Sequence, residues 1–232
     1  MIKLSVRFVA RYLVANEATK TELLVTQKYP RPEMLARSRF YSEARTTISA
    51  FHRGTTTRDE IDARIAALRT EARHADRWSR SELVSNADVL ERYMYQQGHR
   101  LLQLEARPTD DLVRSDVRVT ARPTLFAIEN GKRRLIFLEL SENCDKAMKR
   151  VLAQLAFEAF RSVLRNLAPS AIQVVDVRGG HVLELDRPGS SIGRDLAIAC
   201  KTITTEWPRI LPPKGWKGSR SASDRQVPIE WK

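Results

Sequence analysis

The sequence predicts an α/β protein in which a helical N-terminal region precedes a mixed β-sheet flanked by helices. The first observation is a change of period at Gly98: before it, apolar residues recur at spacings of three and four, and after it they alternate. The second is Asn130-Gly131 between two apolar runs, which is the strongest short signal for a β-hairpin. The third is a broad apolar face over residues 142–167, which predicts a long buried helix directly after the hairpin.

The first 98 residues have the pattern of helices separated by turn residues. Ser5 is placed to cap the first helix, and Pro30 and Pro32 interrupt the chain after it. Gly54 and three threonines end the helix before residue 58. Helices are predicted over residues 5–16, 33–51, 58–76 and 87–97.

The rest of the chain combines strands with two helices and ends in a basic tail. Pro169 begins a new element, and Gly179-Gly180 predicts a turn between two further strands. Strands are predicted over residues 100–105, 117–120, 125–129, 135–140, 172–177 and 182–185, with a last helix over 193–207. The expected domains are a helical region over 1–98, an α/β core over 99–211 and a tail over 212–232.

Composition favours a polyanionic partner and excludes several other classes of protein. Among 232 residues, 40 Lys and Arg against 28 Asp and Glu give a formal charge of +12, which makes nucleic acid the leading partner. A genome of high GC content also raises the number of arginines, so charge alone does not decide. Cys144 and Cys200 each stand alone, which predicts buried thiols and excludes a zinc knuckle or an iron–sulfur cluster. No run of eighteen uncharged apolar residues occurs, so we expect no membrane partner and a cytoplasmic location.

Three short stretches have a resemblance to a known family. Residues 121–127 (ARPTLFA), 129–131 (ENG) and 135–141 (LIFLELS) resemble the hairpin of the RecB-like branch of the PD-(D/E)XK nuclease superfamily. In that family the hairpin has Pro-Asp, a short turn and an apolar strand that ends in Asp/Glu-x-Lys. Gln154 stands where the family has a glutamine on the next helix. The resemblance covers about residues 100–186 and implies a restriction-endonuclease-like mixed sheet flanked by helices.

The resemblance also implies which positions would be catalytic. In the family, two carboxylates hold a magnesium-type cation and the lysine helps to activate the attacking water. Matched by position, Thr124 replaces the aspartate, Ser141 replaces the lysine, and Glu139 remains. One carboxylate beside a hydroxyl is a poor magnesium site, because it provides little charge against the cost of dehydrating the ion. The favoured interpretation is a catalytically inactive fold in which a cation such as Arg122 neutralises Glu139.

Two other interpretations stay open. In an active metal-dependent nuclease, Asp116 or Glu129 would supply the second acid. Glu139 and Asp116 would then bind Mg²⁺ or Mn²⁺, the sole cofactors expected, and Lys146 or Lys149 would replace the missing lysine. In the last interpretation the likeness is accidental and the hairpin belongs to an ordinary α/β scaffold.

Arginines form a basic ridge on and just after the helix predicted for residues 58–76. Arg69, Arg73 and Arg77 recur at spacing four. Such a ridge is either a solvated face paired with nearby carboxylates or a surface that contacts phosphates. The candidate nucleic-acid-binding residues are Arg69, Arg73, Arg77, Arg37, Arg39 and Arg45.

The function expected from these features is that of a nucleic-acid-associated, catalytically inactive subunit of a bacterial defence, mobile-element or repair complex. Its protein partner would be a helicase, a nuclease or a guide-dependent effector, as is common for the resembled fold. The first alternative is an active nuclease. The second is a protein-assembly module without nucleic-acid contact, in which the tail around Trp216 and Trp231 would be a docking strap.

Overall fold

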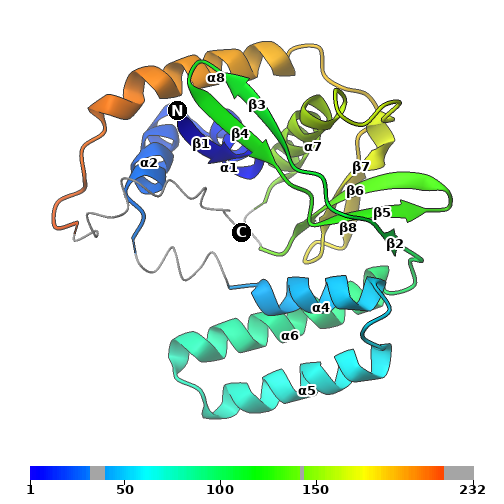
Figure 1. The fold of residues 1–232 in the computed structure, drawn as a ribbon. Coiled ribbons are helices and arrows are strands. Elements are labelled where there is room, and N and C mark those ends of the chain that lie inside the picture. The colour runs from blue at the N-terminus through cyan, green and yellow to red at the C-terminus, as the bar shows by residue number, and fades with distance from the viewer. Residues whose placement is uncertain (32–39, 142–143, 217–232) are drawn as a thin grey trace.

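The centre of the fold is a mixed five-stranded β-sheet in the order β2-β5-β6-β7-β8 (Figure 1). The structure is a computed structural model that describes residues 1–31, 40–141 and 144–216. β5 and β6 form the hairpin predicted from Asn130-Gly131, where both residues have positive φ, as a type I′ turn requires. The α/β class is confirmed. The strands of this sheet are β2 (Gln103–Leu104), β5 (Leu125–Glu129), β6 (Lys132–Glu139), β7 (Ile172–Asp176) and β8 (His181–Glu184).

A helix connects β6 to β7, and these two strands are parallel. The helix is α7 (Lys146–Phe160), and its N-cap Asp145 accepts a hydrogen bond from the backbone N of Met148 at 2.7 Å. A crossover of this kind is needed because a tight turn returns the chain antiparallel. In register, Glu139 stands opposite Asp176, so the two strands end at the same edge of the sheet.

A smaller sheet, in the order β1-β4-β3, brings the N-terminus into the core. The first helix is preceded by a strand that the sequence analysis did not predict, and this strand runs parallel to β4. The backbone N of Ile2 donates to the carbonyl oxygen of Asp116 at 2.7 Å, in the Ser115-Asp116 turn that joins β3 and β4. The strands are β1 (Ile2–Ser5), β3 (Asp110–Arg114) and β4 (Val117–Ala121).

Side-chain caps set where the N-terminal helices begin. Ser5 caps the first helix, as predicted, and its hydroxyl accepts from the backbone N of Phe8 at 3.2 Å. Asp76 accepts from the backbone N of Trp78 and Ser79, so a new helix begins at residue 77, ten residues before the predicted start. The helices are α1 (Val6–Val14), α2 (Glu17–Lys28), α4 (Ser42–His52), α5 (Arg58–His74) and α6 (Arg77–Gln97). None of the helices in the described ranges combines the length and the apolar composition needed to cross a bilayer.

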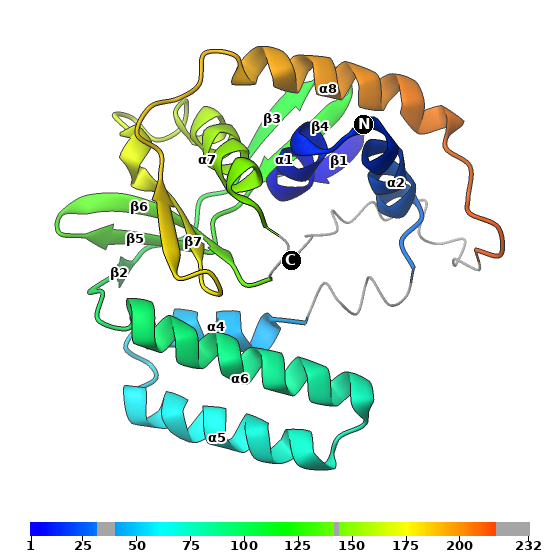
Figure 2. The same ribbon diagram turned by 180° about the vertical axis from the view of Figure 1, so that it is seen from behind.

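Both faces of the five-stranded sheet are covered, and each face has its own apolar cluster (Figures 1 and 2). Successive side chains of a strand point to opposite faces. Leu135 and Phe137 of β6 therefore belong to the cluster with α1, α7 and α8 (Ile192–Glu206), whereas Ile136 and Leu138 belong to the cluster with α4, α5 and α6. The sheet is thus the middle layer of three.

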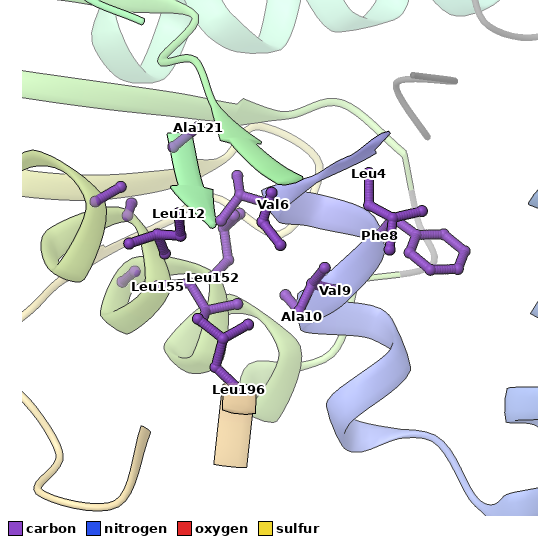
Figure 3. Close-up of a cluster of buried hydrophobic side chains, with 14 of the residues drawn as sticks. Leu4, Val6, Phe8, Val9, Ala10, Leu112, Ala121, Leu152, Leu155 and Leu196 are labelled. Carbon is purple, nitrogen blue, oxygen red and sulfur yellow. The ribbon is translucent and has the colours of Figure 1, made fainter. Parts of the chain in front are cut away.

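The helical region predicted over residues 1–98 shares both clusters with the later residues. Figure 3 shows Val6 and Val9 of α1 on the side that faces Leu152 of α7, with Leu196 of α8 nearby, whereas Leu4 of β1 lies beside Phe8. Helices α4–α6 pack on β5, β6 and β7 through the second cluster. The boundary expected at residue 98 therefore does not separate two apolar cores.

The chain after α8 folds back onto α2. A short 3-10 helix, η1 (Pro169–Ala171), precedes β7, and a second one, η2 (Trp207–Arg209), follows α8. Nζ of Lys28 donates to the carbonyl oxygen of Trp207 at 2.6 Å, and the ring of Trp216 meets Tyr29 edge-on with 5.0 Å between centroids. Trp216 thus packs within the chain, whereas Trp231 lies outside the described residues.

Candidate functional site

Thr124, which precedes β5, lies next to the end of β6, whose last residue is Glu139. The backbone N of Leu138 donates to Oγ1 of Thr124 at 3.1 Å, and the backbone N of Thr124 donates to the carbonyl oxygen of Ile136 at 2.8 Å. Ser141 follows Glu139 by two residues and is half-buried. The structure therefore brings three of the four predicted catalytic positions to one edge of the sheet.

Glu139 is buried and forms an ion pair with Arg7 of α1. The side chains are 3% and 10% exposed, and Nε of Arg7 is 2.7 Å from Oε1 of Glu139. These two atoms are not aligned for a hydrogen bond, but Arg7 also donates from Nη2 to the carbonyl oxygen of Leu138 at 2.6 Å. Arg122, the cation expected at this position, is exposed. Glu139 thus has a cationic partner, but the partner is a residue that no local sequence pattern connects to it.

A second carboxylate, Asp176, stands opposite Glu139 and was not predicted. It is 9% exposed, and its Oδ2 accepts a hydrogen bond within an ion pair from Nζ of Lys149. Its Oδ1 accepts from the backbone N of Gly179 at 2.8 Å. The sequence contained a signal for it, because β6 and β7 are both apolar runs that end in an acid, and parallel strands end at the same edge. Lys149, one of the two lysines considered as replacements, thus contacts Asp176.

Cys144 lies next to these groups but is a poor nucleophile. Burial, followed by the charge of Glu139, raises the pKa of its thiol to about 12. Its Sγ is 3.5 Å from Sδ of Met148. A thiol with so high a pKa stays protonated at neutral pH. Cys144 and Cys200 are both buried, as predicted.

Arg7, Glu139, Lys149 and Asp176 together form a charge-balanced group that we call the sheet-edge cluster. Carboxylate oxygens are the ligands that Mg²⁺ and Mn²⁺ prefer, so Glu139 and Asp176 are the residues here that a divalent ion would use. Each of them is already paired with a protein cation. Within the described residues, no three His, Cys, Asp or Glu side chains are grouped to hold a metal.

Gln154, the fourth predicted catalytic position, points elsewhere. It follows Lys149 by five residues on α7, which places it about 140° around the helix. Its side chain packs on Gly189, where an added Cβ would lie 2.8 Å from Nε2 of Gln154. The structure therefore associates Gln154 with the connection between β8 and α8.

Asp116 and Glu129, the acids considered for a migrated site, are also away from the sheet-edge cluster. Asp116 is in the β3–β4 turn beside the start of β1, whereas Arg7 follows the end of β1. Glu129 ends β5 next to the hairpin turn, and its Oε1 is 2.7 Å from Nε of Arg100. Hydrogen bonding to Arg100 lowers the pKa of Glu129. The structure does not bring Asp116 to Glu139 as a second metal ligand.

The arginines of the predicted basic ridge do not share one helix. Arg69 and Arg73 lie on α5, whereas Arg77 is the first residue of α6. Nη2 of Arg69 is 2.7 Å from Oε2 of Glu91 and 3.4 Å from Oδ1 of Asp88, so its charge is offset by carboxylates of the neighbouring helix. Exposed pairs of this kind contribute little to stability.

The region around this ridge has no surplus of positive charge. Residues 42–97 contain nine Lys and Arg and nine Asp and Glu. Of the other candidate arginines, Arg45 is half-buried on α4, and Arg37 and Arg39 lie outside the described residues. The ridge as a phosphate-contacting surface stays a prediction.

Comparisons with known proteins found no relative of this chain. No protein-family model, no curated protein and no solved structure matches the chain.

Proposed function

We propose that this chain is a nucleic-acid-associated protein of the PD-(D/E)XK type that lacks nuclease activity and acts as a subunit of a bacterial defence, mobile-element or repair complex in the cytoplasm. The proposal depends on one observation: Glu139 and Asp176 are both neutralised by protein cations. A nuclease of this type needs carboxylates that are free to bind a divalent ion. In this chain the negative charges of Glu139 and Asp176 are already compensated by Arg7 and Lys149.

The order of the elements supports the relation to this superfamily. A β5–β6 hairpin, helix α7 and a parallel β7 follow one another, and Thr124 lies next to the end of β6, where the family has its acids. One fold serves many functions, so the order of the elements supports common ancestry with the superfamily but says nothing about nuclease activity. The argument for inactivity comes from the sheet-edge cluster.

The neutral cluster also favours contact with phosphates. Two unpaired carboxylates at the sheet edge would repel a phosphate, and pairing with Arg7 and Lys149 removes most of that repulsion. The formal charge of +12 attracts a polyanion. Binding through phosphates does not depend on base sequence and weakens steeply with salt. A subunit of this kind would take its biological role from its protein partner.

Cleavage and binding measured on one preparation test the proposal. Labelled single- and double-stranded DNA and RNA are incubated with Mg²⁺ or Mn²⁺, and affinity is followed by fluorescence anisotropy between about 50 and 200 mM salt. We expect salt-dependent binding without cleavage. The double variant Arg7→Met/Glu139→Gln removes one ion pair as a unit and serves as the control. Mn²⁺-dependent cleavage that this variant loses would overturn the proposed inactivity, and absence of binding would overturn the association with nucleic acid.

An active metal-dependent nuclease is the second candidate, and one observation favours it. Glu139, Asp176 and Lys149 lie at one edge of the sheet and supply the two acids and the lysine that the chemistry uses. In this candidate a divalent ion that arrives with the substrate displaces Arg7 from Glu139. Cleavage that is lost in Asp176→Asn and in Lys149→Met would support it. Cleavage that both variants retain would identify a contaminant.

A further inference from the structure

Positive charge is distributed unequally across the five-stranded sheet. Helices α4–α6 cover one face, and their residues 42–97 have equal numbers of basic and acidic side chains. The opposite face is covered by elements from residues 1–31, 144–171 and 185–216, which together contain sixteen Lys and Arg but seven Asp and Glu. Figure 2 shows α1, α7 and α8 together on that side. A polyanion is therefore attracted to the α7–α8 side of the molecule.

Several cations on that side are already committed to contacts within the protein. Arg7 and Lys149 are paired in the sheet-edge cluster, and Lys28 donates to carbonyl oxygens at the end of α8. Lys146 and Arg150 differ from them because both are exposed. Neither has an ion-pair or hydrogen-bond partner among the described side chains. They are one helical turn apart, so their Cα atoms are separated along α7 by about 6 Å.

Two further exposed cations flank the point where the chain after β8 meets α7. Gln154 lies one turn beyond Arg150 on the same side of α7, and it packs on Gly189. This contact holds the connection against α7. Arg187 and Arg194, on either side of Gly189 in sequence, are exposed and have no partner of opposite charge among the residues that the structure describes. We call Lys146, Arg150, Arg187 and Arg194 the α7–α8 track.

The surroundings of the α7–α8 track fit a phosphate backbone better than a protein surface. The exposed large apolar side chains nearest to it in sequence are Val163 after α7, Val182 on β8 and Ile198 on α8, one turn after Arg194. Exposed apolar residues that are scattered singly over different elements are normal for a protein surface. Protein interfaces usually have an apolar, aromatic-rich centre, whereas phosphate contacts need only cations and polar donors. Asp145 beside Lys146, Asp186 in the connection and Asp195 in the first turn of α8 reduce the positive charge, but four cations against three carboxylates leave it positive.

We infer that the α7–α8 track is the surface that contacts the phosphate backbone of a nucleic acid, in place of the arginine ridge on α5 and α6. This inference rests on the proposed association with nucleic acid. The track begins at Lys146, three residues before Lys149, so a strand bound along it passes the neutralised sheet-edge cluster. The contacts involve phosphates, and binding is therefore independent of base sequence.

Two double variants with the same change of net charge test the inference. Lys146→Glu/Arg150→Glu alters the track, and Arg73→Glu/Arg77→Glu alters exposed arginines of the ridge. Affinity for labelled duplex and single-stranded DNA and RNA is measured by fluorescence anisotropy as a function of salt. The logarithm of the association constant falls as the logarithm of the salt concentration rises, and loss of two phosphate contacts on a duplex makes this slope shallower by about 2. We expect this change, and at least about tenfold weaker binding at low salt, for the track variant and less than about a twofold change for the ridge variant.

The possible outcomes are distinct. Equal loss in the two variants would indicate an effect of total charge and would overturn the inference, as would a loss confined to the ridge variant. No binding by the unaltered protein would instead contradict the proposed function itself. Thermal unfolding of each variant shows whether it is folded. We expect the track variant to fold, because Glu at position 146, the first residue of α7, interacts favourably with the helix dipole. If the track variant unfolds, Lys146→Gln/Arg150→Gln replaces it and Arg73→Gln/Arg77→Gln becomes the matched control. Weaker binding is again expected for the track variant alone.

Discussion

Arg7 and Glu139 are each buried next to a charge of opposite sign, so each charge is compensated by the other where water is excluded. A buried ion pair is not by itself a large source of stability, because both ions have lost their hydration. Removing one partner is different, since the other charge then stays buried without compensation. The pair therefore makes a sharp prediction about single and double variants.

Glu139→Gln and Arg7→Met should each lower the free energy of unfolding by about 3–5 kcal/mol. The double variant Arg7→Met/Glu139→Gln should cost clearly less than the sum of the two, because no unpaired charge remains. Urea unfolding of the four proteins measures this coupling. Additive losses would mean that the two side chains do not act as a pair.

His52 is a second buried group whose charge matters. Its Nε2 is 2.7 Å from Oη of Tyr93, and the residue is 9% exposed. Burial, and next the charge of Arg100, lowers the pKa of His52 from 6.5 to about 4. The folded protein therefore holds this imidazole neutral over a pH range in which the unfolded chain protonates it.

Stability should fall as pH decreases from about 6.5 towards 4, because the unfolded chain binds a proton at His52 that the folded protein does not bind. Above 6.5 His52 is neutral in both states and contributes no pH dependence. Denaturant midpoints measured at intervals of pH report the slope. His52→Gln retains a polar partner for Tyr93 without titrating, so its slope over this range should be shallower. An unchanged slope would show that other groups dominate.

At the scale of elements, the caps and turns explain which predictions were accurate. Ser5 and Asn130-Gly131 act through contacts within a few residues, and both were predicted in place. Asp76 acts in the same way but was not recognised as a cap, so α6 was predicted to begin at residue 87. β1 was missed because its four residues form a strand only through pairing with β4.

The same substitution should have opposite effects at two glycines. Gly131→Ala places a Cβ in the hairpin turn at a φ of 73°, and the loss of stability should be about 1–2 kcal/mol. Gly193→Ala in α8 meets nothing within 4 Å and should raise stability by about 1 kcal/mol through helix propensity. Thermal and urea unfolding of both variants compare them directly. A loss of stability in Gly193→Ala would contradict the open space at that position, and unchanged stability in Gly131→Ala would contradict the positive φ at the turn.

For the whole molecule, the two apolar clusters meet through one sheet. Leu135 and Phe137 belong to one cluster, and Ile136 and Leu138 belong to the other. Loss of β6 would therefore expose both clusters at once. The strand β1 and the helix α1 also belong to the cluster with α7 and α8, so these N-terminal elements depend on later residues for their apolar contacts.

The chain should therefore unfold in a single cooperative transition. Far-ultraviolet circular dichroism and tryptophan fluorescence should give the same midpoint, and calorimetric and van't Hoff enthalpies should agree. Trp78 reports on α6, whereas the other three tryptophans, Trp207, Trp216 and Trp231, follow α8 in the sequence, so Trp78→Phe removes the signal of α6 from the fluorescence. Two transitions, with α4–α6 melting first, would favour the independent helical region that the sequence predicted.

Four features could be predicted from the amino-acid sequence alone: the α/β class, the hairpin, the buried helix after it and the capped first helix. These follow from periodicity, turn chemistry and caps, which depend on residues close together in the chain. The three-dimensional fold was needed to show that Arg7 neutralises Glu139, that Asp176 and Lys149 complete the sheet-edge cluster, and that the α7–α8 side has a surplus of positive charge. The physical reason is that ion pairs and parallel strand pairing join residues distant in sequence, and local patterns contain no record of which distant partner each residue will meet.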